Sequence, residues 1–128
     1  MRSNIRPAGI APTPPFYVPA VRAGNTIYVA GQLARAADGS IVGVGDMRAQ
    51  TRKCLENLRI ILEAAGARMA DVVKITAFMT DMSRAPEAWE VRTEYFAANP
   101  PASTGVEVKA LTRPDCLIEI EAIAVVEA

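Results

Sequence analysis

The segment CLIEIEAIAVV, residues 116–126, places two carboxylates in the most apolar stretch of the chain. In a β-strand successive side chains alternate, so Glu119 and Glu121 share one face and Ile118 and Ile120 share the other. Burying an unpaired carboxylate costs on the order of several kcal/mol, and the group takes up a proton instead. A glutamate that is partly protonated near neutral pH can serve as a general acid or base.

A purely structural role for the two glutamates is the alternative. If the neighbouring strand is residues 105–111, Glu107 and Lys109 lie beside them on the same face. Lys109 would then pair across strands with one glutamate, a contact worth roughly 0.2–1 kcal/mol. Three carboxylates against one lysine still leave excess negative charge, so the acid–base hypothesis stays open.

The composition narrows the chemistry further. The 128 residues include fourteen basic and fourteen acidic side chains, which disfavours nucleic-acid binding through bulk electrostatics. Histidine is absent, so the commonest metal ligand is missing and Ser-His or Cys-His nucleophile pairs are excluded. The sequence therefore predicts chemistry by carboxylate, tyrosine, backbone groups or water, without a metal.

Two cysteines and the hydropathy pattern indicate the environment of the protein. Cys54 and Cys116 belong to no C-x-x-C pair, which is typical of inert core thiols in a reducing compartment. No run approaches the roughly 18–20 apolar residues of a spanning helix, and the N-terminus has no apolar signal segment. We expect a soluble cytoplasmic protein.

The N-terminal half predicts an extended arm and a hairpin that precede a long helix. Residues 1–15 contain four of the nine prolines, each of which forfeits a backbone donor. The alternating segments 17–21 and 26–33 predict two antiparallel strands joined by a turn, and residues 40–44 a short further strand. From residue 47 to residue 65 apolar residues recur at three- and four-residue steps, with Asp46 as N-cap and Gly66 at the C-terminal cap.

The C-terminal half predicts a strand, a second helix and two more strands. Residues 72–80 alternate with Val73, Ile75, Ala77 and Met79 on one face. A helix over residues 85–98 follows, stopped by Asn99-Pro100-Pro101, and its candidate packing residues are Trp89, Val91, Tyr95 and Phe96. Strands over residues 105–111 and 117–126 end the chain.

This order of elements predicts a single α+β domain over residues 1–128, in which both helices cover one face of a largely antiparallel sheet. The other face carries Glu119, Glu121, Ile123 and Val125 together. A half-polar, half-apolar open face is expected of an oligomer surface.

Several segments together resemble the RidA (YjgF, or reactive intermediate deaminase) superfamily, which also carries the label endoribonuclease L-PSP. They are Tyr17 before a strand, VAGQ in the second strand, DMRAQTRKCLENLRIILEAAGA in the long helix, DVVKITAFMTDM, and LIEIEAIAV at the end. The resemblance implies a chorismate-mutase-like fold and a homotrimer with a central β-barrel, whose small-molecule clefts lie between subunits. It also implies hydrolysis of reactive enamines and imines to 2-oxo acids and ammonia, without a cofactor.

The resemblance carries three site residues over to this chain. Tyr17 matches the cleft tyrosine, and Gly31 matches the glycine after the second strand's hydroxyl position. Glu119 matches the glutamate that positions or activates the attacking water, so it is the catalytic candidate.

Four further positions depart from the deaminase pattern, and at a fifth, Thr104, the alternatives are a hydroxyl in the site or the end of a turn. The deaminase motif P-A-R-S/T grips the substrate carboxylate with its arginine, whereas here Ser103 stands in that place and Thr104 follows. Ala30 replaces a family serine, Ser83 stands where an asparagine is frequent, and Gly105 where a cysteine is common. A serine hydroxyl cannot bind a carboxylate through two charged hydrogen bonds as a guanidinium does.

Three functional alternatives follow. The first is an enzyme that hydrolyses an imine or enamine. In that case Lys109, Arg113 or Arg35 replaces the missing arginine, or the substrate is an imine or enamine other than the usual 2-imino acid. The second alternative is a non-catalytic protein that binds a small metabolite or acts in proteostasis through the same cleft. RNA cleavage is disfavoured by the zero net charge, the missing histidine and the few aromatic residues.

Overall fold

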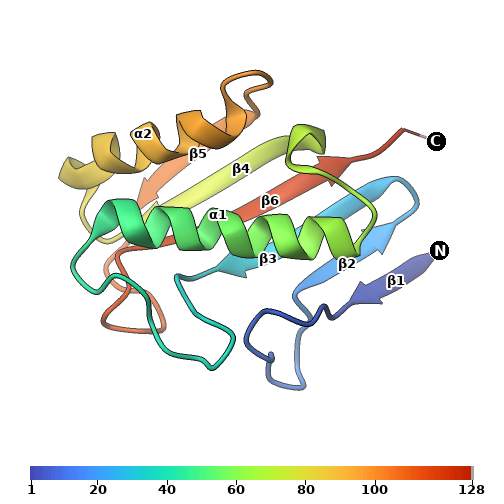
Figure 1. Ribbon diagram of the computed structural model, residues 1–128, viewed down its shortest axis with the longest axis horizontal. Coiled ribbons are helices and arrows are strands. Elements are labelled where there is room, and N and C mark those ends of the chain that lie inside the picture. The colour runs from blue at the N-terminus through green and yellow to red at the C-terminus, as the bar shows by residue number, and fades with distance from the viewer. Residues whose placement is uncertain (128) are drawn as a thin grey trace.

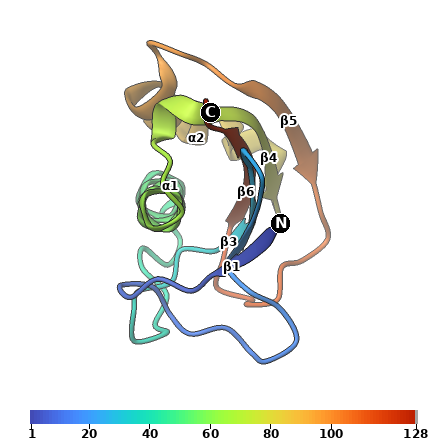
Figure 2. The ribbon, with the colours of Figure 1, turned by 90° about the vertical axis from the view of Figure 1, so that its right-hand side faces the viewer.

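The computed structural model describes residues 1–127, which form a six-stranded sheet with two α-helices on one of its faces (Figures 1 and 2). The strand order is β1-β2-β3-β6-β4-β5, and all neighbours are antiparallel except β4 and β5. The predicted α+β class is confirmed. The elements are β1 (Arg2–Ile5), β2 (Ala20–Ala23), β3 (Thr26–Gln32), α1 (Met47–Ala64), β4 (Val72–Met79), α2 (Ala85–Phe96), β5 (Ala102–Glu107) and β6 (Ile118–Val125), with 3-10 turns η1 (Met69–Asp71) and η2 (Met82–Arg84).

Helix α1 forms as its apolar periodicity predicts. The Asp46 side chain accepts a hydrogen bond of 3.0 Å from the backbone N–H of Ala49, which satisfies one of the free donors of the first turn. Gly66 ends the helix with a φ of +87°, a left-handed conformation that favours glycine. The buried face of α1 lies on β3 and β6 and includes Cys54, Leu55, Leu58, Ile61 and Leu62.

Strand β6 lies in the middle of the sheet, between β3 and β4. Its even-numbered residues are buried under the helices, and Ile118 and Ile120 are completely covered. Each such side chain contributes roughly 1.5–3 kcal/mol of hydrophobic stabilisation. The alternation therefore fixes Glu119 and Glu121 on the opposite, open face, as the sequence predicts.

The predicted neighbour of β6 is wrong. Helix α2 connects β4 to β5 as a crossover, so that β5 runs in the same direction as β4. Strand β5 therefore pairs in parallel with β4, at the sheet edge, and does not touch β6. The partners of Glu119 and Glu121 on β4 are Phe78 and Thr76, respectively. Lys109 lies beyond the end of β5 and is exposed, so the cross-strand pairing of Lys109 with a glutamate does not form.

Two strand assignments also need correction. Val73 is 47% exposed instead of packing with Ile75, because the pairing of β4 with β6 shifts register between Val72 and Lys74. The segment 40–44 forms only an isolated bridge from Ile41 to Arg35. Gly43 and Gly45 adopt positive φ angles there, which interrupts an extended backbone.

The N-terminal arm and helix α2 differ from expectation as well. The arm begins with a strand, β1, which pairs with β2 at the sheet edge. Trp89 was predicted to pack in the core, yet it is 54% exposed. Helix α2 buries Val91 and Phe96 together with its small residues Ala85 and Ala88, and this stripe leaves Trp89 to one side.

Candidate functional site

A cavity of about 690 Å³ lies where the N-terminal arm passes the end of β3 and the loop before β6. Four of the residues predicted for the site line it together. Its lining includes Tyr17, Ala30, Gly31 and Glu119, with Phe16, Arg35, Asn57 and Arg113. Tyr17 and Glu119 are far apart in the sequence, and the cavity brings them together.

The Glu119 carboxyl is the one acidic group among the residues that line this cavity. Burial raises its pKa first of all, and the carboxylate of Glu121, two residues further along the same face, raises it further. Within residues 1–127 no hydrogen bond or ion pair engages the Glu119 side chain. A half-buried carboxyl without a partner holds its proton to higher pH than an ordinary glutamate, and a raised pKa of this kind is typical of groups that transfer protons.

Gly31 provides the space that the Glu119 carboxyl occupies. A Cβ atom added at Gly31 would lie 2.8 Å from both the carboxyl carbon and Oε2 of Glu119. The pairing of β3 with β6 shifts register between Val29, opposite Ala122, and Gln32, opposite Ile120, so Ala30 and Gly31 form a bulge opposite Glu121. Bulges beside functional sites commonly redirect a strand in this way.

Two buried amides of α1 hold the strands that carry these residues. The Asn57 Nδ2 group donates to the backbone oxygens of Leu33, at 3.2 Å, and of Arg35, at 3.0 Å, which fixes the chain just after β3. Gln50 accepts a hydrogen bond of 2.7 Å from the Leu117 N–H and donates one of 2.9 Å to the Asp115 oxygen. The second pair of bonds fixes the start of β6, two residues before Glu119.

The rim of the cavity is aromatic and comes from the segment between the N-terminal arm and β2. Tyr17 is 41% exposed, and its ring meets that of Phe16 edge-on, with centroids 5.4 Å apart. The Ala30 N–H donates to the Pro19 oxygen at 2.9 Å, which ties the end of β3 to this segment. The arm thus forms part of the cavity wall in addition to supplying a strand.

Two of the three cations considered as replacements for the missing arginine lie at this cavity. Arg35 lines it, and its Nε atom is buried without a partner. Arg113 lines it too, and it donates to the Gly39 oxygen at 3.3 Å and pairs with Asp115 at 3.6 Å. Lys109 is not part of the lining.

The remaining predicted site residues lie elsewhere on the chain. Ser83 lies within η2, and its hydroxyl donates to the side chain of the N-cap residue Asp81 at 2.6 Å. Thr104 accepts a hydrogen bond from Lys74, and Gly105 is exposed on β5, where an added Cβ atom would lie 3.7 Å from the Met79 side chain. On a single chain these residues do not line the cavity that contains Glu119.

Ser103 lines a second and smaller cavity, which also contains residues that the sequence analysis did not assign to a site. This cavity lies between α2 and the start of β5 and includes Trp89 and Arg92. A signal for Arg92 exists in the sequence. The residues three and four positions away on the helix are Ala88, Trp89, Tyr95 and Phe96, none of which is acidic, so the helix offers this arginine no local partner.

The comparisons with known proteins identify the family. The family model described as Endoribonuclease L-PSP matches residues 8–126. A RutC family protein of Pyrococcus horikoshii is 44% identical over 108 residues, which are 84% of this chain and 85% of that protein. The 3-aminoacrylate deaminase RutC of Acinetobacter baylyi is 41% identical over 120 residues, 94% of each chain.

A solved structure from Thermotoga maritima has the same fold. It superposes with a TM-score of 0.94 at 38% sequence identity, and the match covers 100% of both chains. The chain therefore belongs to the Endoribonuclease L-PSP family, that is, to the RidA/YjgF superfamily.

Two further findings apply to residues 1–127. No helix in this part of the chain is long and apolar enough to cross a membrane. The same residues contain no group of three or more cysteine, aspartate or glutamate side chains placed to hold a metal ion.

Proposed function

We propose that this protein hydrolyses a small reactive imine or enamine to a carbonyl compound and ammonia, with Glu119 as the catalytic acid and base. The observation that carries the proposal is the Glu119 carboxyl, which has a raised pKa, has no partner among residues 1–127, and lies over Gly31 in a cavity rimmed by Tyr17. The deaminase activity named for the Acinetobacter baylyi relative, 41% identical over nearly the whole chain, supports it.

The reaction needs one proton carrier. The imine reacts as its protonated form, the iminium. The Glu119 carboxylate takes a proton from water as the water oxygen bonds to the iminium carbon, and the nitrogen becomes a neutral amine. The carboxylic acid then gives this proton to the nitrogen, the C–N bond breaks and ammonia leaves, and the Glu119 carboxylate takes the hydroxyl proton as the carbonyl forms. An enamine first accepts a proton at its β-carbon and becomes the imine. Positioned proton transfer of this kind supplies about 10²- to 10⁴-fold in rate.

The proposed assembly is a homotrimer in which the open sheet faces meet and neighbouring subunits complete each cavity. The open face supports this, because Tyr28 and Val125 are 51% and 44% exposed there, and Tyr28 pairs with Ile123 of β6. Exposed apolar side chains grouped on one sheet face are typical of an interface. The cavity beside Glu119 opens at the end of the same strands.

The test measures ammonia release from a panel of imines and enamines generated in situ. We expect Glu119→Gln to reduce the rate by about 10²-fold or more, while Glu127→Gln, at an exposed glutamate of the same chain end, leaves it unchanged. Light scattering must give the same mass for both variants and for the wild-type protein. A Glu119→Gln variant that retains the wild-type rate would disprove the proposal.

Binding without turnover is the outcome that would favour the alternative function. Thermal stabilisation of the wild-type protein by a metabolite, with no ammonia released from any member of the panel, would indicate a protein that binds a metabolite without converting it. A ligand at about 100 times its dissociation constant adds roughly 2.7 kcal/mol to the free energy of unfolding, which a melting curve resolves.

A further inference from the structure

The second cavity has a volume of about 280 Å³ and lies on the helix-covered side of the sheet edge. Its floor and walls come from the last turns of α2 and from the segment that leads into β5. The lining residues are Trp89, Arg92, Thr93, Phe96, Ala97, Pro100, Pro101 and Ser103. A cavity of this size holds a small organic molecule, and most of its lining is apolar.

Arg92 is the one charged side chain in that lining. Its Nη2 group donates a hydrogen bond of 2.6 Å to the Ser103 hydroxyl, and its Nε group is buried without a partner. Burial alone lowers the pKa of the guanidinium, which shows that no neighbouring carboxylate offsets the loss of hydration. Within residues 1–127 Arg92 makes no ion pair.

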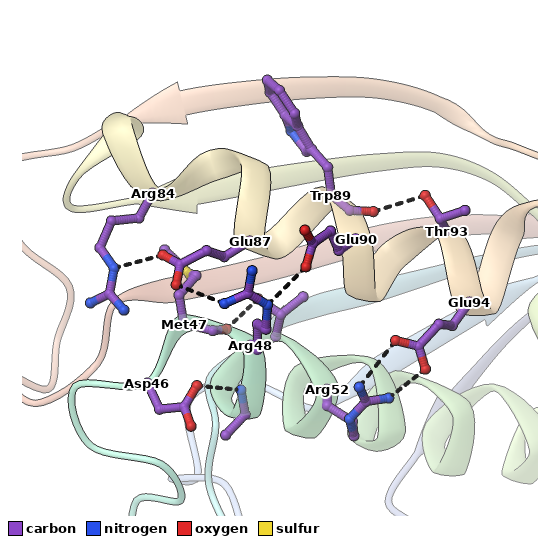
Figure 3. A network of polar contacts seen from close by, with 12 residues as sticks. Asp46, Met47, Arg48, Arg52, Arg84, Glu87, Trp89, Glu90, Thr93 and Glu94 are labelled. Atoms are coloured by element: carbon purple, nitrogen blue, oxygen red, sulfur yellow. Dashed lines mark hydrogen bonds and ion pairs between the residues drawn. The ribbon is translucent and has the colours of Figure 1, made fainter.

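The other arginines at the junction of α1 and α2 differ from Arg92 in this respect. Arg48 pairs with Glu87 and Glu90, and Arg52 pairs with Glu94 at 2.9 Å (Figure 3). These pairs lie between the two helices, whereas the Trp89 side chain points away from α1 (Figure 3). Arg92 lies with Trp89 in the cavity, apart from this ion-pair network.

An arginine that is half buried without an anion lowers stability unless it gains something in return, because its charge has lost hydration. A carboxylate in the cavity would supply the missing charge. Its two oxygens match the fork of guanidinium donors, and only one of these donors is engaged with Ser103. The exposed indole ring of Trp89 offers a flat apolar surface for the rest of the molecule.

We propose that Arg92 binds the carboxylate of the substrate. The guanidinium reaches position 103 from helix α2, and the small Ser103 side chain leaves room for it and orients it. The substrate is then an imine or enamine that carries a carboxylate, which revises the expectation from the sequence that the missing arginine at position 103 excludes the usual 2-imino acids.

This inference rests on the proposed function and on the proposed trimer. Glu119 projects from the open face of β6, two strands away from β5, and Arg92 lies on the covered side at the sheet edge. The two side chains therefore do not reach one small molecule within a single chain. They act on the same substrate when the Arg92 cavity of one subunit adjoins the Glu119 cavity of the next.

The test uses the single tryptophan of the chain, Trp89, as a fluorescent reporter of the cavity. The wild-type protein is titrated with butyrate and with butanamide, which differ in charge and hardly in shape, at constant ionic strength. We expect butyrate to change the fluorescence with saturation and butanamide to bind at least about ten times more weakly. Arg92→Gln should weaken butyrate binding by about 10- to 100-fold, the range for a hydrogen bond to a charged group.

Two variants serve as controls. Arg52→Gln removes an exposed arginine that pairs with Glu94 and should leave the butyrate affinity unchanged. Arg92→Lys keeps the charge but not the planar fork, and we expect it to recover only part of the affinity. It also provides a second measurement if Arg92→Gln does not fold, since an Arg92→Lys variant with wild-type affinity for both probes would contradict paired hydrogen bonding.

The outcomes separate this inference from the proposed function. Equal butyrate affinity in wild-type protein and in folded Arg92→Gln, or equal affinity of the wild-type protein for butyrate and butanamide, would overturn the role of Arg92 and leave the role of Glu119 intact. Butyrate binding that depends on Arg92, in a protein whose ammonia release does not depend on Glu119, would disprove the proposed function alone.

Discussion

The carboxyl group of Glu119 occupies the position where a side chain on Gly31 would begin. The 2.8 Å between a Cβ atom at residue 31 and the carboxyl carbon is shorter than any ordinary contact. Gly31 does not have a positive φ, so its backbone conformation is open to other residues. A side chain at position 31 and the Glu119 carboxyl in its present place exclude one another, so the two positions are coupled.

This coupling predicts the effect of Gly31→Ala. The new methyl group must displace the Glu119 side chain from its place in the cavity, so we expect a loss of free energy of unfolding and of ammonia release together. In a Glu119→Ala background the methyl group meets no carboxyl, and the stability cost of Gly31→Ala should largely disappear. Urea unfolding of the four proteins measures a coupling of about 0.5–3 kcal/mol.

A second glycine-to-alanine substitution, at a glycine away from Glu119, is the control for this double-mutant cycle. Gly105→Ala adds a methyl group at ordinary contact distances of 3.7 and 3.8 Å from two methionine side chains, and it should show no coupling to Glu119→Ala. Additive effects of Gly31→Ala and Glu119→Ala on the free energy of unfolding would mean that the two side chains do not compete for the same space.

Glu119→Gln should stabilise the fold at neutral and alkaline pH. The folded-state pKa of Glu119 is raised by burial and by Glu121, so ionisation of this carboxyl weakens the folded state as pH rises through that pKa. Glutamine removes the ionisation. We expect a higher melting temperature than wild type at about pH 8, and no difference at about pH 3, where the carboxyl is protonated in both folded and unfolded chains. Calorimetry at both pH values measures the melting temperatures of the two proteins. A Glu119→Gln variant that melts lower than wild type at about pH 8 would contradict the prediction.

Glu121→Gln should move the acid limb of the pH–rate profile to lower pH. The proposed water activation needs ionised Glu119, so the rate falls as pH drops through its pKa. The carboxylate of Glu121 is the second cause of the raised pKa, after burial, and its removal lowers the pKa. The measurement is the initial rate of ammonia release against pH in wild type and in Glu121→Gln, with Glu127→Gln as the matched loss of one charge. A limb that stays in place in Glu121→Gln would show that the two carboxylates do not interact.

The strongly periodic elements could be predicted from the sequence, and the pairing between them could not. The apolar repeat after Asp46 and the alternation from Ile118 to Val125 fix one face of each element, because a slip would expose that whole face to water. Which strand lies beside β6 depends on the crossover through α2, and no residue of β5 or β6 specifies it locally. The assignment of Lys109 as a neighbour of Glu119 failed for this reason.

The candidate site also contains residues that could be predicted from the sequence and residues that could not. Tyr17, Gly31 and Glu119 carry the resemblance to the family and line one cavity. Arg92 was missed because its significance depends on the absence of an acidic partner in space, which a single sequence shows only along its own helix. The prediction of Trp89 as a packing residue of the second helix is wrong, because the small residues of α2 bury a stripe that does not include it.

Ser103→Arg tests whether a guanidinium carried by residue 103 can replace the guanidinium of Arg92 in binding the carboxylate. Beside Arg92 a second guanidinium would replace a hydroxyl that now accepts a hydrogen bond of 2.6 Å, so we expect the single variant to melt below wild type from like-charge repulsion. In the Arg92→Gln background the same substitution returns one guanidinium to this place. The double variant should then recover butyrate affinity to within about tenfold of wild type, and its two substitutions should be strongly non-additive in both melting temperature and affinity. Light scattering and circular dichroism verify that each variant is assembled and folded. A folded double variant that binds butyrate no better than Arg92→Gln would show that a cation at this position does not hold the carboxylate.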